Sequence, residues 1–72
     1  MPEKYFERMI PQTRLAAHAM LLGKKADEIP FGTSVENGLR TTWPDWKSKR
    51  GELLQALGTV MEQNGEELPE SK

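Results

Sequence analysis

Hydrophobic residues recur along this chain at the three- and four-residue spacing that places them on one face of a helix. The first such segment begins at Pro2, a residue suited to the first turn of a helix, and it ends before Pro11. Because proline disfavours helical geometry in the preceding residue, the segment is predicted as a short helix ending near Met9 or as the front of a kinked longer helix. Its apolar stripe consists of Tyr5, Phe6, Met9 and Ile10.

A second helix is predicted from about Pro11 to Leu22, with one or two further turns to Glu28 as an alternative. Its apolar residues step by four, three, four and three, as in one seam of a coiled coil, although the run is too short for a coiled coil. Gly23 fits either a C-cap or an internal position, and Pro30 ends the helix in both cases. The predicted seam is Leu15, Ala19, Leu22, Ala26 and Ile29, flanked by Ala16, Ala17, Met20 and Leu21.

Residues 33–42 have two interpretations. Thr33 and Glu36 have the spacing of a capping box, with Thr33 as the N-cap, which predicts a short helix. Asn37-Gly38 instead fits the two-residue turn of a β-hairpin. We favour the helix, because an isolated hairpin is only marginally stable in water and no other segment has the pattern of a strand.

The last helix is predicted to begin at Pro44, with Thr42 or Trp43 near its N-cap, and to stop at Asn64-Gly65. The segment 66–72 that follows is short, acidic and proline-containing, as disordered tails often are. One face of the helix carries Trp46, Arg50, Leu53, Leu57 and Val60, with Leu54 and Met61 beside it.

These elements predict an all-α fold, a small bundle of three to four short helices. The alternative is an α+β fold with a hairpin around Asn37-Gly38. Residues 1–65 are predicted to form a single helical domain, and residues 66–72 a disordered acidic tail.

The composition limits how such a chain can be stabilised. A core built from 72 residues is marginal, and cysteine is absent, so disulfides cannot reinforce it. With no thiolate and His18 as the single histidine, no zinc site is expected, and no cofactor or other metal site is predicted. The fold must therefore be stabilised by good helix packing or by association with another chain. A homodimer and a monomer are about equally compatible with this size.

Charge is unevenly distributed along the chain. Residues 1–50 carry nine basic and six acidic side chains, whereas residues 51–72 carry one basic and five acidic. The net charge of −1 argues against a dedicated nucleic-acid-binding protein, but the basic excess keeps that possibility open for the first fifty residues. No apolar run is long enough to span a membrane and the N-terminus lacks an apolar leader, so we expect no membrane association and a cytoplasmic location.

No residue pattern indicates an enzyme. His18 lies in an alanine-rich stretch of the second helix and is interpreted as a surface or boundary residue without a nucleophile beside it. Gly23-Lys24-Lys25 resembles the end of a phosphate-binding loop, but the upstream glycine and the Ser or Thr are missing. A helix-turn-helix over residues 14–39 is disfavoured, because acids and Pro30 occupy its second helix.

The segment from Thr41 to Arg50 is the best candidate contact region, since it holds both tryptophans and three cations within four positions. Cations at the start of a helix oppose its dipole, so one interpretation is a site for an anion or an acidic partner. The other is that the tryptophans belong to the core and the cations to the solvated face. The candidate contact residues are Arg40, Trp43, Trp46, Lys47, Lys49 and Arg50.

These observations predict a small non-enzymatic helical interaction protein, a regulator, adaptor or inhibitor that acts through contact with another protein or with itself. The alternative is a nucleic-acid-associated regulator that uses the basic start of the last helix.

Overall fold

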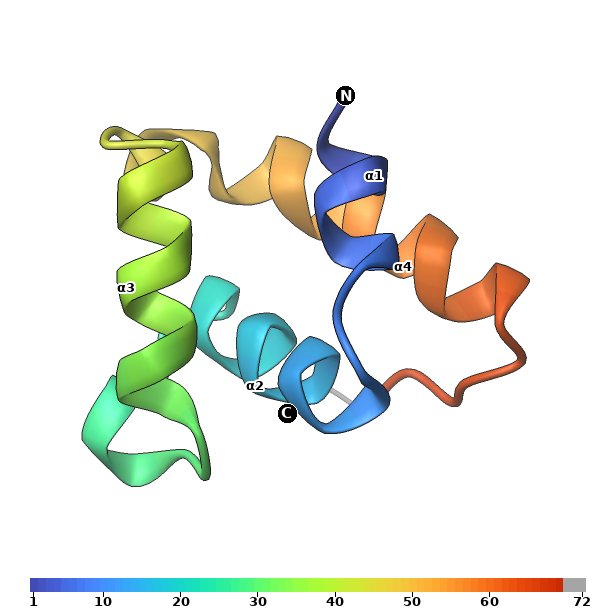
Figure 1. The fold of residues 1–72 in the computed structure, drawn as a ribbon, viewed down its shortest axis with the longest axis horizontal. Coiled ribbons are helices and arrows are strands. Elements are labelled where there is room, and N and C mark those ends of the chain that lie inside the picture. Colours follow the sequence, from blue (N-terminus) through green and yellow to red (C-terminus); the bar gives the residue numbers. More distant parts are fainter. Residues whose placement is uncertain (70–72) are drawn as a thin grey trace.

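The computed structural model describes residues 1–69, which contain four α-helices, two 3-10 turns and no strand (Figure 1). The predicted all-α fold is therefore confirmed for this part of the chain. The elements in chain order are α1 (Pro2–Glu7), α2 (Pro11–Leu21), η1 (Ala26–Glu28), α3 (Gly32–Thr42), η2 (Trp46–Lys49) and α4 (Arg50–Gln63).

Prolines and glycines mark the helix boundaries in the first half of the chain. Pro11 is the first residue of α2, and Ile10 before it is extended at φ −83° and ψ 163°, so the first of the two predicted alternatives, a separate short helix, is correct. Gly23 adopts φ +109°, in the left-handed region that favours glycine, and it directly follows the C-cap of α2. The predicted extra turns to Glu28 are a separate 3-10 turn instead of a continuation of α2.

The start of α3 differs from the capping-box prediction, although the helix itself is confirmed over the hairpin. Phe31 is the N-cap, at φ 64°, and no side chain caps the helix, so Thr33 lies inside the first turn. The backbone N–H of Val35 donates to the carbonyl of Phe31 at 3.0 Å. The physical reason is a close approach: a Cβ on Gly32 would lie 2.1 Å from the carbonyl oxygen of Ala26, so only glycine allows α3 to begin here.

The last helix begins six residues later than predicted. Pro44 and Asp45 form a turn, and the N–H of Trp46 donates to the carbonyl of Trp43 at 2.9 Å, a three-residue spacing tighter than that of an α-helix. Only from Arg50 does α4 run continuously. Its predicted stop is correct, because α4 ends at Gln63 and Gly65 adopts φ +70°.

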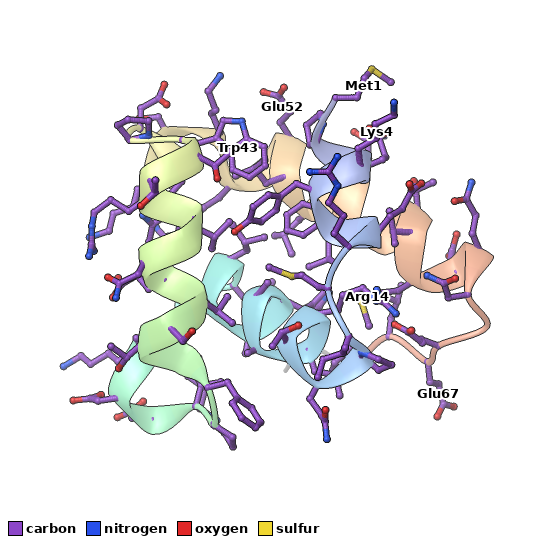
Figure 2. All side chains as sticks on the ribbon, viewed as in Figure 1. Met1, Lys4, Arg14, Trp43, Glu52 and Glu67 are labelled. Carbon is purple, nitrogen blue, oxygen red and sulfur yellow. The ribbon has the colours of Figure 1, made fainter. Side chains whose placement is uncertain are left out.

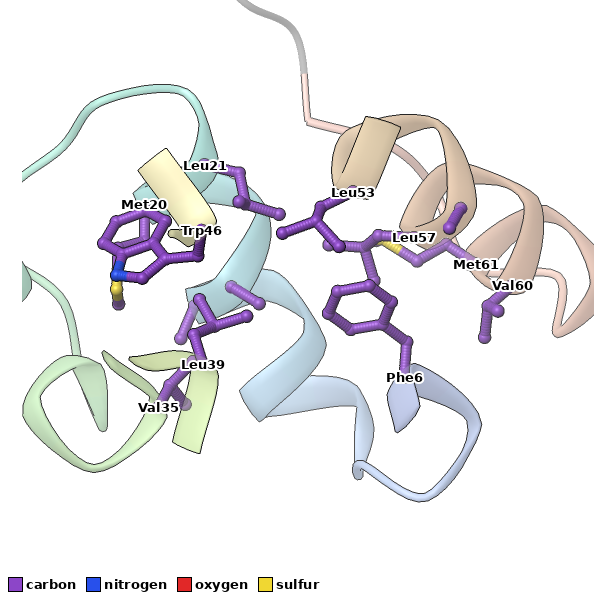
Figure 3. Packing of buried hydrophobic residues seen from close by; sticks show 13 residues of the cluster. Phe6, Met20, Leu21, Val35, Leu39, Trp46, Leu53, Leu57, Val60 and Met61 are labelled. Carbon is purple, nitrogen blue, oxygen red and sulfur yellow. The ribbon is translucent and has the colours of Figure 1, made fainter. Parts of the chain in front are cut away.

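The core forms where α4 meets α1 and α2, with α3 covering the other side of α2 (Figures 1 and 3). Phe6 of α1 lies against Leu57 at one end, and Trp46 lies near Met20 and Leu39 at the other, with Leu53 between the two groups (Figure 3). The buried hydrophobic residues are Phe6, Ala16, Ala17, Met20, Leu21, Val35, Leu39, Trp46, Leu53, Ala56, Leu57, Val60 and Met61.

The predicted seam of α2 is not the buried face. Leu15 and Leu22 are 45% and 49% exposed, whereas the residues that were expected only to flank the seam are buried. The reason lies in the neighbours: α2 contacts both α3 and α4, and the small side chains of Ala16 and Ala17 allow close approach between helices. The heptad-spaced leucines therefore face outward.

Arg14 joins three segments through a buried guanidinium (Figure 2). Its Nη1 donates to the carbonyl of Phe6 at 3.1 Å and to that of Met9, and its Nε donates to Oε1 of Glu66 at 2.9 Å. The same guanidinium forms an ion pair with Glu66 and holds the pKa of that carboxyl below its usual range. Glu66 is consequently attached to the domain, and the disordered acidic tail over residues 66–72 stays a prediction. Residues 67–69 are exposed, and 70–72 lie outside the described part.

Candidate functional site

The two tryptophans occupy different environments. Trp46 is 3% exposed and belongs to the core, as one of the two interpretations expected. Trp43 is half-buried, with its ring centroid 5.0 Å from that of Tyr5 and 6.1 Å from that of Phe6. Trp43 thus attaches the end of α3 to α1, and neither ring lies flat on the surface as a platform for a ligand.

The predicted cations divide into two groups. Lys47 Nζ lies 5.8 Å and Arg50 Cζ 5.1 Å from the ring centroid of Trp46, both within reach of a cation–π contact. Arg40, on α3, instead donates a hydrogen bond to the side chain of Asn37, and Lys49 is half-buried at the end of η2. The fold therefore brings together three of the six predicted contact residues.

Lys47, Arg50 and the edge of Trp46 line a hollow of about 440 Å³, which we call the basic hollow. The turn after α2 also lines it, and there Lys24 and Lys25 contribute two further cations. The sequence analysis did not predict these two lysines as contact residues. The motif that could have indicated them is Gly23-Lys24-Lys25, which resembles a phosphate-binding loop only in part. The lining consists of Met20, Gly23, Lys24, Lys25, Ala26, Asp27, Thr33, Glu36, Trp46, Lys47 and Arg50.

The charged groups of the basic hollow are not neutralised by one another. It contains four cations and two carboxylates, Asp27 and Glu36. Within residues 1–69, the ion pair between Arg14 and Glu66 is the one that forms, and it lies elsewhere. Arg50 also keeps a buried Nε without a hydrogen-bond partner. The hollow thus presents positive charge that no ion pair neutralises.

A second, mainly apolar surface lies along the outer face of α2. It is a groove of about 340 Å³ between α2 and the segment from Glu28 to Phe31, which we call the α2 groove. Phe31 stands at its edge, 58% exposed and with the left-handed backbone described above. The lining consists of Gln12, Leu15, Ala16, Ala19, Lys24, Glu28, Ile29, Pro30 and Phe31.

His18 is buried, which corrects its interpretation as a surface or boundary residue. It is 9% exposed, its Nδ1 is buried without a hydrogen-bond partner, and burial lowers its pKa. The side chain lines neither the basic hollow nor the α2 groove. In the described part of the chain, no three His, Asp or Glu side chains are grouped as metal ligands would be.

Comparison of the chain with protein-family models, with curated proteins and with solved structures gave no match, so its function is argued from these two surfaces. None of the helices in residues 1–69 combines the length and hydrophobicity needed to cross a bilayer.

Proposed function

We propose that this chain is a small non-enzymatic interaction protein that acts through protein–protein contact, and that the α2 groove is its contact surface. The occupant that we propose is a second copy of the chain. The observation that carries the proposal is that two exposed large apolar side chains, Leu15 and Phe31, line this groove, and a third, Leu22, lies further along the same face of α2.

The exposed apolar residues of α2 lie on one face of the helix. Leu15, Ala19 and Leu22 are spaced four and three apart on one face of α2, where an exposed heptad-like stripe is suited to packing against another helix. The backbone of Phe31 is in the left-handed region. This conformation costs a residue with a side chain about 1 to 2 kcal/mol, whereas glycine would adopt it without that cost. A strained residue that projects a hydrophobic ring beside a groove is typical of a binding surface.

The surface suits a second copy because it is self-complementary. A two-fold contact requires one patch to contain both a projection and its receptor, and here Phe31 stands next to the groove. The rim also carries one cation and one carboxylate, Lys24 and Glu28, which can pair reciprocally across a two-fold axis. Ala19, in the middle of the stripe, leaves room for two α2 helices to approach each other.

The size of the chain supports the same conclusion. A standard interface buries about 800 Å² on each partner, roughly one sixth of the 4806 Å² accessible surface. Burial on that scale would supplement a hydrophobic core that is limited by a length of 72 residues.

Sedimentation equilibrium across protein concentrations from micromolar to millimolar tests this proposal. The wild-type chain is expected to form a dimer, and Leu15→Ser and Phe31→Ser are each expected to raise its dissociation constant at least about tenfold. Ile10→Ser is the matched control, because Ile10 is 55% exposed but does not line the groove. A wild-type chain that stays monomeric at millimolar concentration refutes the proposal, as does a control variant that weakens the dimer equally.

A nucleic-acid-associated regulator is the second candidate function. It is favoured by the cations of the basic hollow, with Arg40 and Lys49 on neighbouring elements. Its signature is binding that weakens steeply with salt and that is abolished by Lys47→Glu combined with Arg50→Glu. Mobility-shift assays at low salt with single- and double-stranded DNA and RNA test it, and no shift with any of them excludes it.

A further inference from the structure

We infer that the basic hollow is a binding site for a phosphate monoester that carries hydroxyl groups, held by Lys24, Lys25, Lys47 and Arg50. The inference does not rest on self-association through the α2 groove, although Lys24 lines both surfaces. It narrows the second candidate function to a defined phosphate site.

Charge is the first observation. Four cations and two carboxylates give the hollow a net charge of two positive in a chain whose total is −1. A phosphate monoester carries about −1.5 to −2 at neutral pH, so one such group balances the hollow. The cations come from two segments that are far apart in sequence, the turn after α2 and the η2–α4 junction.

Two of the four cations, Lys47 and Arg50, contact Trp46 without any ligand. The buried ring of Trp46 fixes a surface over which Lys47 and Arg50 lie at 5.8 and 5.1 Å. Arg50 is also the first residue of α4, after Lys49 as N-cap, so these charges oppose the helix dipole where an anion would favour it. The arrangement is locally unfavourable without an anion, and residues that break a local rule in this way are typical of functional sites.

The lining also selects the kind of phosphate. A volume of about 440 Å³ lies in the range of small-molecule sites and exceeds what one phosphate fills. Asp27 and Glu36 lie in the same lining, where they repel additional phosphates and can accept hydrogen bonds from hydroxyl groups. Thr33 adds a further hydroxyl contact. The chemistry therefore fits a sugar phosphate, either as a free mononucleotide or as the terminal phosphate of a nucleic acid strand.

An NMR titration of the ¹⁵N-labelled chain with adenosine monophosphate, at constant ionic strength, tests the site directly. Saturable shifts are expected at the Trp46 indole N–H and at the amides of residues 23–27. Lys25→Gln and Lys47→Gln are each expected to weaken binding about fivefold, since each removes one charge-assisted contact. Lys49→Gln is the matched control from the same turn, outside the lining, and should change affinity less than about twofold.

Shifts no larger than those produced by sodium chloride overturn the inference if single- and double-stranded oligonucleotides that carry a 5′-terminal phosphate also fail to bind. A Lys49→Gln loss equal to that of Lys47→Gln also overturns it. Lys25 is exposed in a turn, so its variant keeps the test valid if Lys47→Gln unfolds the chain.

Parallel titrations with the oligonucleotides distinguish the sources of the phosphate. Oligonucleotide binding that is lost in Lys25→Gln and Lys47→Gln supports the site with a nucleic acid as its source. Oligonucleotide binding that depends only on Arg40 and Lys49 contradicts it. Repeating the titration with Leu15→Ser separates the outcome from that of self-association, because this change leaves the basic hollow intact.

Discussion

Replacing Arg14 tests how the ends of this small domain are held together. Arg14 is 5% exposed, and its donors reach the carbonyl of Phe6 in α1, the carbonyl of Met9 between α1 and α2, and the carboxylate of Glu66 after α4. Arg14→Met keeps a long, unbranched apolar stem and removes every donor. The α1–α2 connection and the segment after α4 then lose their shared contact.

The expected loss in free energy of unfolding depends on which groups lose their hydrogen-bond partners in Arg14→Met. The Phe6 carbonyl still accepts the N–H of Met9 at 3.2 Å, so the Met9 carbonyl is the acceptor left without a comparable donor. A buried acceptor without a partner costs about 1 to 3 kcal/mol, while methionine avoids the cost of burying a charge. We expect a net loss of about 2 kcal/mol. The total free energy of unfolding of a 72-residue domain is roughly 4 to 11 kcal/mol.

Thermal melting followed by circular dichroism, with urea unfolding followed by tryptophan fluorescence, measures this loss. A loss of about 2 kcal/mol corresponds to a decrease in Tm of roughly 8 to 16 °C for a domain of this size. Arg8→Met is the matched control, since Arg8 is an exposed cation in the same connection and should change Tm little. Glu66→Gln should cost less than Arg14→Met, because it leaves both backbone contacts of Arg14 in place. Equal melting temperatures for Arg14→Met and Arg8→Met would refute the reasoning.

Two further predictions concern a buried histidine and two glycines. Burial lowers the pKa of His18 below 6.5, so the unfolded chain binds the proton more readily than the folded chain does. The free energy of unfolding should therefore fall as the pH drops from 6.5 towards 5. His18→Leu should make the free energy of unfolding, measured by urea titration, depend less on pH over this range. Gly32→Ala would place a Cβ 2.1 Å from the carbonyl oxygen of Ala26 and should lower the free energy of unfolding by about 2 kcal/mol or more. Gly58 lies inside α4 with open space around its Cα, so Gly58→Ala should raise the free energy of unfolding by about 0.5 to 1 kcal/mol. Urea unfolding of both variants checks the signs, and a stabilising Gly32→Ala would contradict the close approach.

The candidate site could be predicted only where its residues are neighbours in sequence. Trp46, Lys47 and Arg50 lie within five positions and were recognised together, and the fold does place them around one hollow. Lys24 and Lys25 are more than twenty residues earlier, and no local pattern links them to the start of α4. Their contribution depends on the fold, which lets the turn after α2 line the same hollow as Trp46, Lys47 and Arg50.

The helices themselves follow from local rules that can be applied to the sequence alone. Pro2 and Pro11 mark helix starts and Gly65 a stop, and the apolar stripe from Leu53 to Met61 of α4 is buried as its spacing predicts. These outcomes depend on backbone geometry and on period, both of which act between residues close in the chain.

Only the tertiary structure decided which faces those helices bury. The heptad spacing of Leu15 and Leu22 selects a face of α2 but cannot say what covers it, and packing of α3 and α4 against Ala16 and Ala17 left those leucines outside. The burial of Arg14 has the same origin, because its partner Glu66 lies 52 residues away. Periodicity specifies a helix and its faces, whereas burial depends on the shapes and volumes of neighbours that are distant in sequence.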